Sequence, residues 1–184
     1  MKKHRLYKLE TYSKKWSGQF LELKNQVISI LDDNIITIQH IGSTSVPGMI
    51  AKPQIDILVV VKDLNKIPYS YKEFESKDFT IHGRGYVTED DEYITLDNKL
   101  TGSRIASLHI MEKNHPDVFQ TILLRDHLRH CKKDRELYIN KKKSLYKDYC
   151  NDYSGYDTGK SETVEKIIEN ANECRVCMDS KVLQ

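Results

Sequence analysis

The stretch that decides the fold of this chain is His40-Ile41-Gly42-Ser43-Thr44-Ser45-Val46-Pro47-Gly48-Met49-Ile50-Ala51-Lys52-Pro53-Gln54-Ile55-Asp56-Ile57-Leu58-Val59. The β-branched run 35–41 predicts a strand whose last residues open this stretch. The apolar run 54–61 predicts a second, central strand. Glycines and prolines between the two predict a loop with at most a short helix. A tight turn at Gly42-Ser43 presents backbone N–H groups, which suit phosphate oxygens.

One carboxylate, that of Asp56, lies in the second apolar strand between Ile55 and Ile57. A buried carboxylate loses solvation, so it has to be paired, lie at the sheet edge or ligate a cation. A Gly-Ser turn followed by a strand aspartate brings a phosphate cradle and a Mg²⁺ ligand together. The alternative is a structural acid at the edge of the sheet.

The rest of the chain surrounds these strands with helices and a less regular middle. Apolar residues at steps of three and four predict an amphipathic helix over 14–31. The sequence therefore predicts an α+β fold with an N-terminal helix, a mixed sheet and a helical C-terminal third. Further elements are expected as a short helix at 70–77, strands at 79–81, 85–88, 93–96 and 107–111, helices from Pro116 with a break near 132–134, and a last helix from Ser161.

Composition narrows the functional classes. The chain has 184 residues and is expected to form one domain over 1–184, with a core at about 12–112 and C-terminal helices at about 116–176. A net charge of +2 does not favour a general nucleic-acid or membrane-surface binder. The charged N-terminus has no apolar segment behind it, no run reaches the length of a membrane span, and four cysteines make no disulfide framework. We therefore expect a cytoplasmic protein.

Several motifs, in order, resemble the GrpB-like family of the nucleotidyltransferase superfamily. The stretch 40–59 is similar to the family signature, and further matches run through most of the chain. These are Tyr12-Ser13-Lys14-Lys15-Trp16 with Phe20, Leu108-His109-Ile110, Leu124-Arg125-Asp126-His127-Leu128-Arg129 with Tyr138 and Lys141-Lys142, and Tyr156-Asp157-Thr158-Gly159-Lys160.

The resemblance implies a nucleotidyltransferase-like core in which Gly42 and Ser43 grip phosphates and Asp56 holds Mg²⁺ or Mn²⁺. The superfamily places a second carboxylate two residues after the first, but this chain has Leu58 there. His109 would stand near a missing third acid, as a ligand for Mn²⁺ or Zn²⁺ or as a general base. A hydrogen-bonded sheet histidine is the alternative for His109. For His40, a strand-end histidine hydrogen-bonded to the backbone is favoured over a site role.

Basic and hydroxyl side chains are the candidates for contact with an anionic nucleotide. Arg125 and Arg129 share one face of a helix, where Arg125 offers a fork-shaped clamp and an ion-pair cluster with Asp126 is the alternative. A solvated loop lysine is the alternative for Lys52. The candidate phosphate-binding residues are Gly42, Ser43, Thr44, Lys52, Arg125, Arg129 and Lys160.

These features predict a metal-dependent nucleotidyltransferase that passes a nucleotidyl group from a nucleoside triphosphate to a small-molecule acceptor. The alternatives are a catalytically impaired nucleotide- or anion-binding module and a coenzyme A-related accessory domain, as the family resemblance suggests. An acid from Glu89, Asp97 or Glu112 near Asp56 would favour the enzyme. No P-loop is present, nucleic acid is not an expected partner, and we expect a monomer or homodimer. The Cys174-x-x-Cys177 pair lacks a second pair at zinc spacing.

Overall fold

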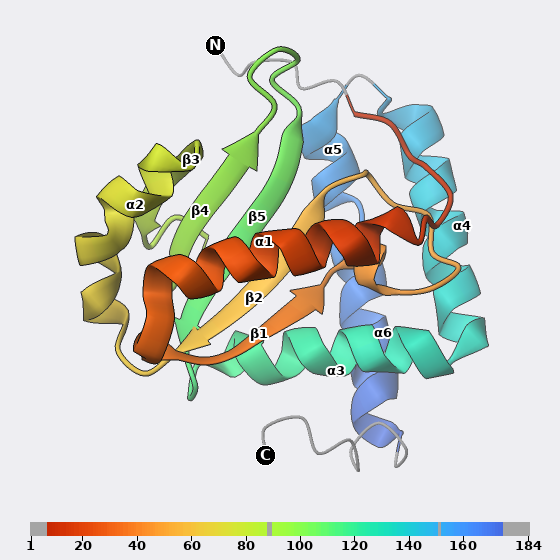
Figure 1. Cartoon of the computed structure of the whole chain (residues 1–184). Coiled ribbons are helices and arrows are strands. Elements are labelled where there is room, and N and C mark those ends of the chain that lie inside the picture. The colour runs from red at the N-terminus through yellow and green to blue at the C-terminus, as the bar shows by residue number, and fades with distance from the viewer. Residues whose placement is uncertain (1–6, 88–89, 151, 175–184) are drawn as a thin grey trace.

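A computed structural model describes residues 7–87, 90–150 and 152–174 of the chain. Its centre is a five-stranded mixed sheet in the order β1-β2-β5-β4-β3, which confirms the expected α+β class (Figure 1). β2 pairs with β5 in parallel, and the other neighbours are antiparallel. The strands are β1 (Ile35–Ile41), β2 (Ile55–Val61), β3 (Phe79–Arg84), β4 (Glu92–Asp97) and β5 (Arg104–Glu112).

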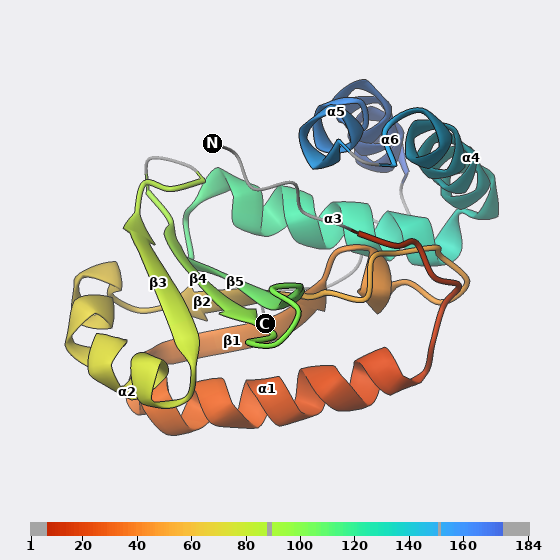
Figure 2. The same ribbon diagram turned by 90° about the horizontal axis from the view of Figure 1, so that it is seen from above.

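Helices cover the two faces of this sheet unequally. α1 (Lys15–Leu31) lies along one face, and α3 (Pro116–His130) crosses the other, with α4 (Lys132–Asp148), α5 (Tyr153–Thr158) and α6 (Ser161–Glu173) gathered beyond it (Figure 2). The short α2 (Tyr71–Ser76) packs at β3, after the 3-10 turn η3 (Leu64–Ser70), and two further 3-10 turns are η1 (Asp32–Asn34) and η2 (Ser43–Ser45). Among the described residues, no helix is long and apolar enough to cross a membrane.

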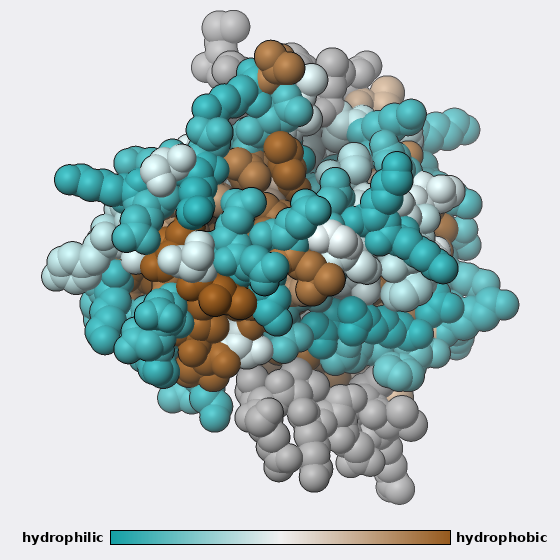
Figure 3. All heavy atoms as spheres, viewed as in Figure 1, coloured by the Kyte–Doolittle hydropathy of each residue, from teal (hydrophilic) through white to brown (hydrophobic). Residues whose placement is uncertain are grey.

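The helix α1 buries the stripe that the sequence predicts for it. Trp16, Leu23, Val27 and Ile30 pack with alternate residues of the strands in the largest apolar cluster. The outward side of the helix is mostly polar, with Leu21 and Ile28 among its exposed apolar residues. Figure 3 shows hydrophobic side chains interspersed among hydrophilic ones on this face of the molecule.

Three expectations about the elements need correction. The strand expected at 85–88 is wrong for 85–87, because β3 continues to Arg84 and the chain then turns at Gly85; Thr88 lies outside the described residues. The helical break lies at Cys131, one residue before the expected position. The short helix α5 was not expected, and its Asp152 side chain caps it by accepting a hydrogen bond from Gly155 N.

Candidate functional site

A cavity of about 490 Å³ lies on the α3 side of the sheet, at the end where β1 runs into the η2 turn. Its walls come from β1, β2, β4 and β5, from the loop 42–54, and from α3, α4 and α5. Most of the predicted site residues share it, namely Gly42, Ser43, Thr44, Lys52, Asp56, His109, Arg125 and Lys160. Segments more than 100 residues apart in sequence therefore meet at one place.

Gly42 and Asp56 fit each other closely. Antiparallel pairing places Ile41 opposite Asp56, so the turn begins directly over the carboxylate. Gly42 has φ +67° and ψ −173°, a conformation that belongs almost only to glycine, and a Cβ there would overlap the Asp56 carboxylate. Gln54 Nε2 donates to Asp56 Oδ1 at 2.7 Å, and no donor from a described residue binds Oδ2. The carboxylate thus keeps one oxygen for a ligand beside the turn.

The parallel pairing of β2 with β5 brings His109 to the same face. Asp56 lies opposite Ser107, and Leu58 lies opposite His109, whose ring is 5.1 Å from the ring of Tyr93. Burial lowers the pKa of His109, although the nearby carboxylates, that of Asp56 first, oppose this shift. The imidazole is therefore neutral at neutral pH and able to accept a proton or bind a metal ion.

The position of the second carboxylate is closed by apolar packing. Leu58 is 1% exposed and packs against Val118 and Ile122 of α3. Two of the acids expected as replacements have other partners: Asp97 pairs with Arg104 at 2.5 Å, and Glu112 accepts from Leu64 N at 3.0 Å. Glu89 lies outside the described residues.

A buried lysine, Lys142, supports the turn; it is part of a motif that resembles the family, but no site role was expected for it. Lys142 of α4 is 4% exposed, and its Nζ donates to Ser43 Oγ and, at 3.1 Å, to the Ile50 carbonyl. Burial lowers its pKa well below the ordinary value, and the positive charges of Lys160 and Lys52 lower it further. Tyr138, Lys142 and Leu145 share the buried face of α4, so a lysine in an apolar stripe was the available signal.

Two more lysines surround the same cavity. Lys52 Nζ lies 3.9 Å from the centre of the Tyr153 ring, a cation–π contact. Lys160 Nζ pairs with Asp157 Oδ1 at 2.6 Å. Burial acts to lower the pKa of Lys160, but interactions with Tyr138 and Asp157 outweigh it and raise the pKa. Lys52, Lys142 and Lys160 therefore share the wall of one cavity with the Gly42-Ser43 turn.

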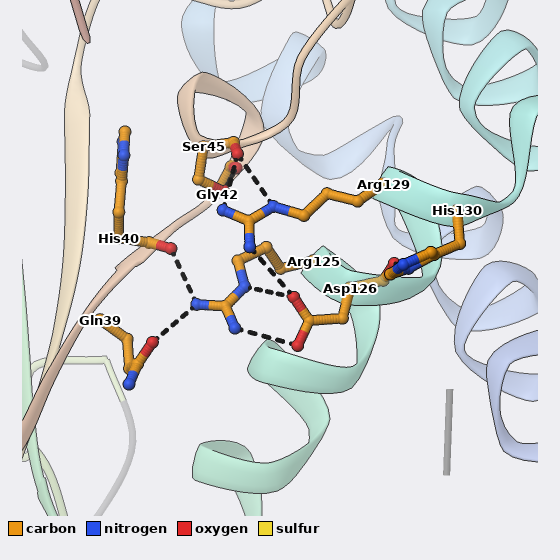
Figure 4. A network of polar contacts seen from close by, with 8 residues as sticks. All are labelled: Gln39, His40, Gly42, Ser45, Arg125, Asp126, Arg129 and His130. Carbon is orange, nitrogen blue, oxygen red and sulfur yellow. Dashed lines mark hydrogen bonds and ion pairs between the residues drawn. The ribbon is translucent and has the colours of Figure 1, made fainter. Parts of the chain in front are cut away.

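The two arginines of α3 tie the helix to β1 and to the turn (Figure 4). Arg125 forms a bidentate pair with Asp126 at 2.7 and 2.9 Å, and its Nη1 donates to Gln39 Oε1 and the His40 carbonyl. Arg129 donates twice to the Ser45 carbonyl at 3.1 and 2.9 Å and is not part of the cavity wall. This geometry favours the ion-pair alternative, in which both arginines hold the turn in place.

His40 and Thr44 support the turn from below. The His40 ring stacks on Phe20 at 4.8 Å, and its Nε2 lies 3.0 Å from Thr44 Oγ1, which donates to the Gln54 carbonyl at 3.1 Å. Burial, with Arg129 and Arg125 nearby, lowers the pKa of His40 to about 4. A neutral imidazole that donates to Thr44 satisfies this arrangement. His40 therefore has the structural role of a hydrogen-bonded histidine at the end of a strand.

Comparison with solved structures identifies the fold. The fold is nucleotidyltransferase-like: Cid1 in complex with the UTP analogue UMPNPP matches with a TM-score of 0.53 at 16% identity, over 81% of this chain and 48% of Cid1. A GLD-2/RNP-8 complex matches with a TM-score of 0.55 at 11% identity, over 90% of this chain and 62% of that one.

The family model of the GrpB protein matches residues 7–170, and the chain belongs to the GrpB family. The crystal structure of GrpB from Enterococcus faecalis is 28% identical with a TM-score of 0.84, over 90% of this chain and 98% of that one. A UPF0157 protein of Streptomyces coelicolor is 32% identical over 170 residues, which are 91% of this chain and 85% of that protein.

Proposed function

We propose that the cavity binds a nucleoside triphosphate together with a divalent cation and transfers its nucleotidyl group to a small-molecule acceptor. The observation that carries the proposal is the close fit of Gly42 over Asp56, with Ser43 and three lysines in the same cavity wall. The fold shared with Cid1, whose complex holds a UTP analogue, supports the same ligand class.

The residues divide into those for phosphate and those for the reaction. Gly42 lets an anion approach the backbone, Ser43 offers a hydroxyl, and Lys52, Lys142 and Lys160 supply positive charge for the triphosphate. Burial lowers the pKa of Lys142, so at a pH above this lowered pKa binding of the triphosphate would draw a proton onto it. His109 would accept the proton of the acceptor hydroxyl as the new bond to phosphorus forms and pyrophosphate leaves.

The donor set fits one cation and not two. Asp56 Oδ2 is the ligand beside the turn, Asp117 is a further carboxylate in the cavity wall, and the apolar Leu58 fills the position of a second carboxylate on β2. A cation held there would offset charge that develops on the transferred phosphoryl group. Carboxylate oxygens suit Mg²⁺ and Mn²⁺, and His109 then stays free to act as the base.

Calorimetric titration tests the binding step. ATP, GTP, CTP and UTP are titrated into the protein with Mg²⁺ and with Mn²⁺, for wild type, Asp56→Asn and the exposed control Asp33→Asn. The expected result is metal-dependent binding that Asp56→Asn weakens at least tenfold and Asp33→Asn leaves unchanged. The proposal is wrong if no triphosphate binds with either metal.

A second candidate function is binding without turnover, and the buried Leu58 favours it. In this case the cavity holds a nucleotide or another polyphosphate as a stable complex. The two functions are separated by incubation of the protein with the triphosphate that binds and a mixture of small hydroxyl and amine acceptors. Release of pyrophosphate that Asp56→Asn abolishes supports transfer, whereas tight binding with no pyrophosphate supports the binding module.

A further inference from the structure

Away from the cavity, three side chains of different chemistry meet at the corner between α3 and α4. His127, Cys131 and Asp134 each offer a metal-ligating atom, and these atoms lie within 4.8 Å of one another. None of the three is part of the cavity wall. The described residues contain no other such group of three or more His, Cys, Asp or Glu side chains.

The backbone of the corner brings the three together. His127 lies in the last turn of α3, Cys131 is the single residue that ends α3 and precedes α4, and Asp134 lies in the first turn of α4. Cys131 N donates to the His127 carbonyl at 2.7 Å, as in one turn of a helix. The thiol and the imidazole, four residues apart, therefore lie on the same side of the corner. The extended backbone of Cys131 then redirects the chain, and Asp134 returns to the same point.

Hydrogen bonds already hold the His127 and Asp134 side chains close together. His127 Nε2 lies 2.7 Å from Asp134 Oδ2, and their side chains are 4% and 5% exposed. Asn170 of α6 donates to the same carboxylate oxygen at 3.0 Å. A hydrogen bond of this kind fixes the orientation of a ligating carboxylate. The exposure of Cys131 is intermediate, so a metal ion has a route to the site from solvent.

We propose that His127, Cys131 and Asp134 bind one borderline-soft divalent cation of the Zn²⁺ type, with a fourth position left to water. A thiolate, an imidazole and a carboxylate form a donor set that suits Zn²⁺ and Co²⁺ and does not suit Mg²⁺. For tetrahedral bonds of about 2.0–2.3 Å, the imidazole nitrogen and the carboxylate oxygen separate to about 3.3 Å, a small side-chain movement from the present contact. The thiol loses its proton on binding.

This site joins three helices that carry or support the walls of the cavity. The ion would lock the α3–α4 corner directly and, through Asn170, hold α6 against it. Lys142 on α4 reaches Ser43, and Arg129 on α3 holds Ser45, so the angle at this corner sets both contacts. The inference does not depend on the ligand of the cavity, because none of the three ligating residues lines it.

Cobalt spectroscopy tests the site directly. The full chain is stripped of metal with a chelator and titrated with Co²⁺, then with competing Zn²⁺, for wild type and for Cys131→Ser and His127→Gln. The controls are Cys150→Ser, which removes an exposed thiol, and a Cys174→Ser/Cys177→Ser double variant, whose second position lies outside the described residues. Circular dichroism confirms that each variant is folded.

The expected result is one equivalent of Co²⁺ with a thiolate-to-cobalt charge-transfer band, which Zn²⁺ displaces. Cys131→Ser removes the band, His127→Gln weakens Co²⁺ binding at least tenfold, and both controls keep the wild-type spectrum. Zn²⁺ also raises the unfolding temperature of wild type and not of Cys131→Ser. A spectrum without the thiolate band, or a band that follows Cys174 and Cys177 instead, overturns the proposal.

Discussion

The two faces of the central sheet use the same strands for different purposes. On the α1 face, Ile55, Ile57 and Val59 of β2 enter a continuous apolar cluster with Leu108 and Ile110 of β5. On the α3 face, the alternate positions carry Asp56 and Ser107 at one end, then Leu58 opposite His109, and then the apolar Val60 and Met111 under α3. One strand therefore stabilises the fold on one side and forms the cavity on the other, because neighbouring side chains point to opposite faces.

The two faces of the sheet should therefore tolerate substitutions differently. The α1 face is closed, so a polar or smaller side chain there costs packing energy. The α3 face is closed only where α3 covers it, and its open end places polar groups around a cavity. Neighbouring residues on one strand should thus affect different properties, the free energy of unfolding on one face and ligand binding on the other.

The largest expected effect comes from adjacent substitutions on β2. Ile57→Ala removes a fully buried side chain from the α1 face and should lower the free energy of unfolding by about 2–5 kcal/mol. At the adjacent position, Asp56→Asn keeps the shape of the side chain and should change the free energy of unfolding by less than about 1 kcal/mol. It should nevertheless weaken metal-dependent triphosphate binding. Denaturant unfolding and calorimetry measure the pair, and equal losses of stability would break the distinction between the faces.

The next effect concerns His40, whose ring packs on α1 as a neutral group. Its pKa is lowered from 6.5 to about 4 in the folded protein, so between these values the unfolded chain binds more protons. Stability is therefore lost as the pH falls from 6.5 towards 4, by as much as about 3 kcal/mol at about 1.4 kcal/mol per pKa unit. Unfolding at pH 7 and pH 4.5 measures this, and His40→Gln, which can still donate to Thr44, should lose less stability over that range than wild type.

Two glycines separate backbone strain from the close approach in the cavity. Gly42 and Gly48 both have positive φ, but only at Gly42 would a Cβ overlap the Asp56 carboxylate. Gly42→Ala should cost about 2 kcal/mol of stability and weaken triphosphate binding. Gly48→Ala should cost about 1 kcal/mol and leave binding unchanged. Equal binding by both variants would show that the carboxylate need not lie beside the turn.

Local patterns predicted most of the fold. The β-branched run predicted β1, the apolar run predicted β2, the apolar stripe predicted α1, and the glycine with the strand aspartate marked the cavity end of the sheet. These features depend on neighbours within a few residues, where periodicity and turn chemistry decide the conformation. The strand expected at 85–88 failed because β-propensity does not determine where pairing ends.

Long-range contacts could not be predicted from a single sequence. Nothing local indicates that β5 lies parallel to β2 with His109 opposite Leu58, since this register depends on the whole sheet. Nor does the spacing of Arg125 and Arg129 tell whether they face a ligand or, as here, hold β1 and Ser45. Pairing of this kind is a property of tertiary structure and follows only once the helices are placed.

The last effect tests the α3 face with a buried amine, that of Lys142. Its pKa lies well below 10.5 in the folded protein, so above that lowered value the unfolded chain binds more protons. The unfolding free energy of wild type should therefore rise, relative to Lys142→Met, as the pH increases towards 10.5. The exposed Lys143→Met is the matched control and should show no such difference.

The same substitution should also affect triphosphate binding. Lys142→Met should weaken triphosphate binding about tenfold, or about 1.4 kcal/mol, because the anion loses a cation inside the cavity. Calorimetry in buffers of different ionisation enthalpy, at pH values rising towards 10.5, should show proton uptake on binding by wild type and by Lys143→Met, but not by Lys142→Met. Uptake that survives in Lys142→Met would place the titrating group elsewhere and leave Lys142 a purely structural support for Ser43. The proton balance therefore decides whether the buried lysine of the α3 face serves the ligand or only the fold.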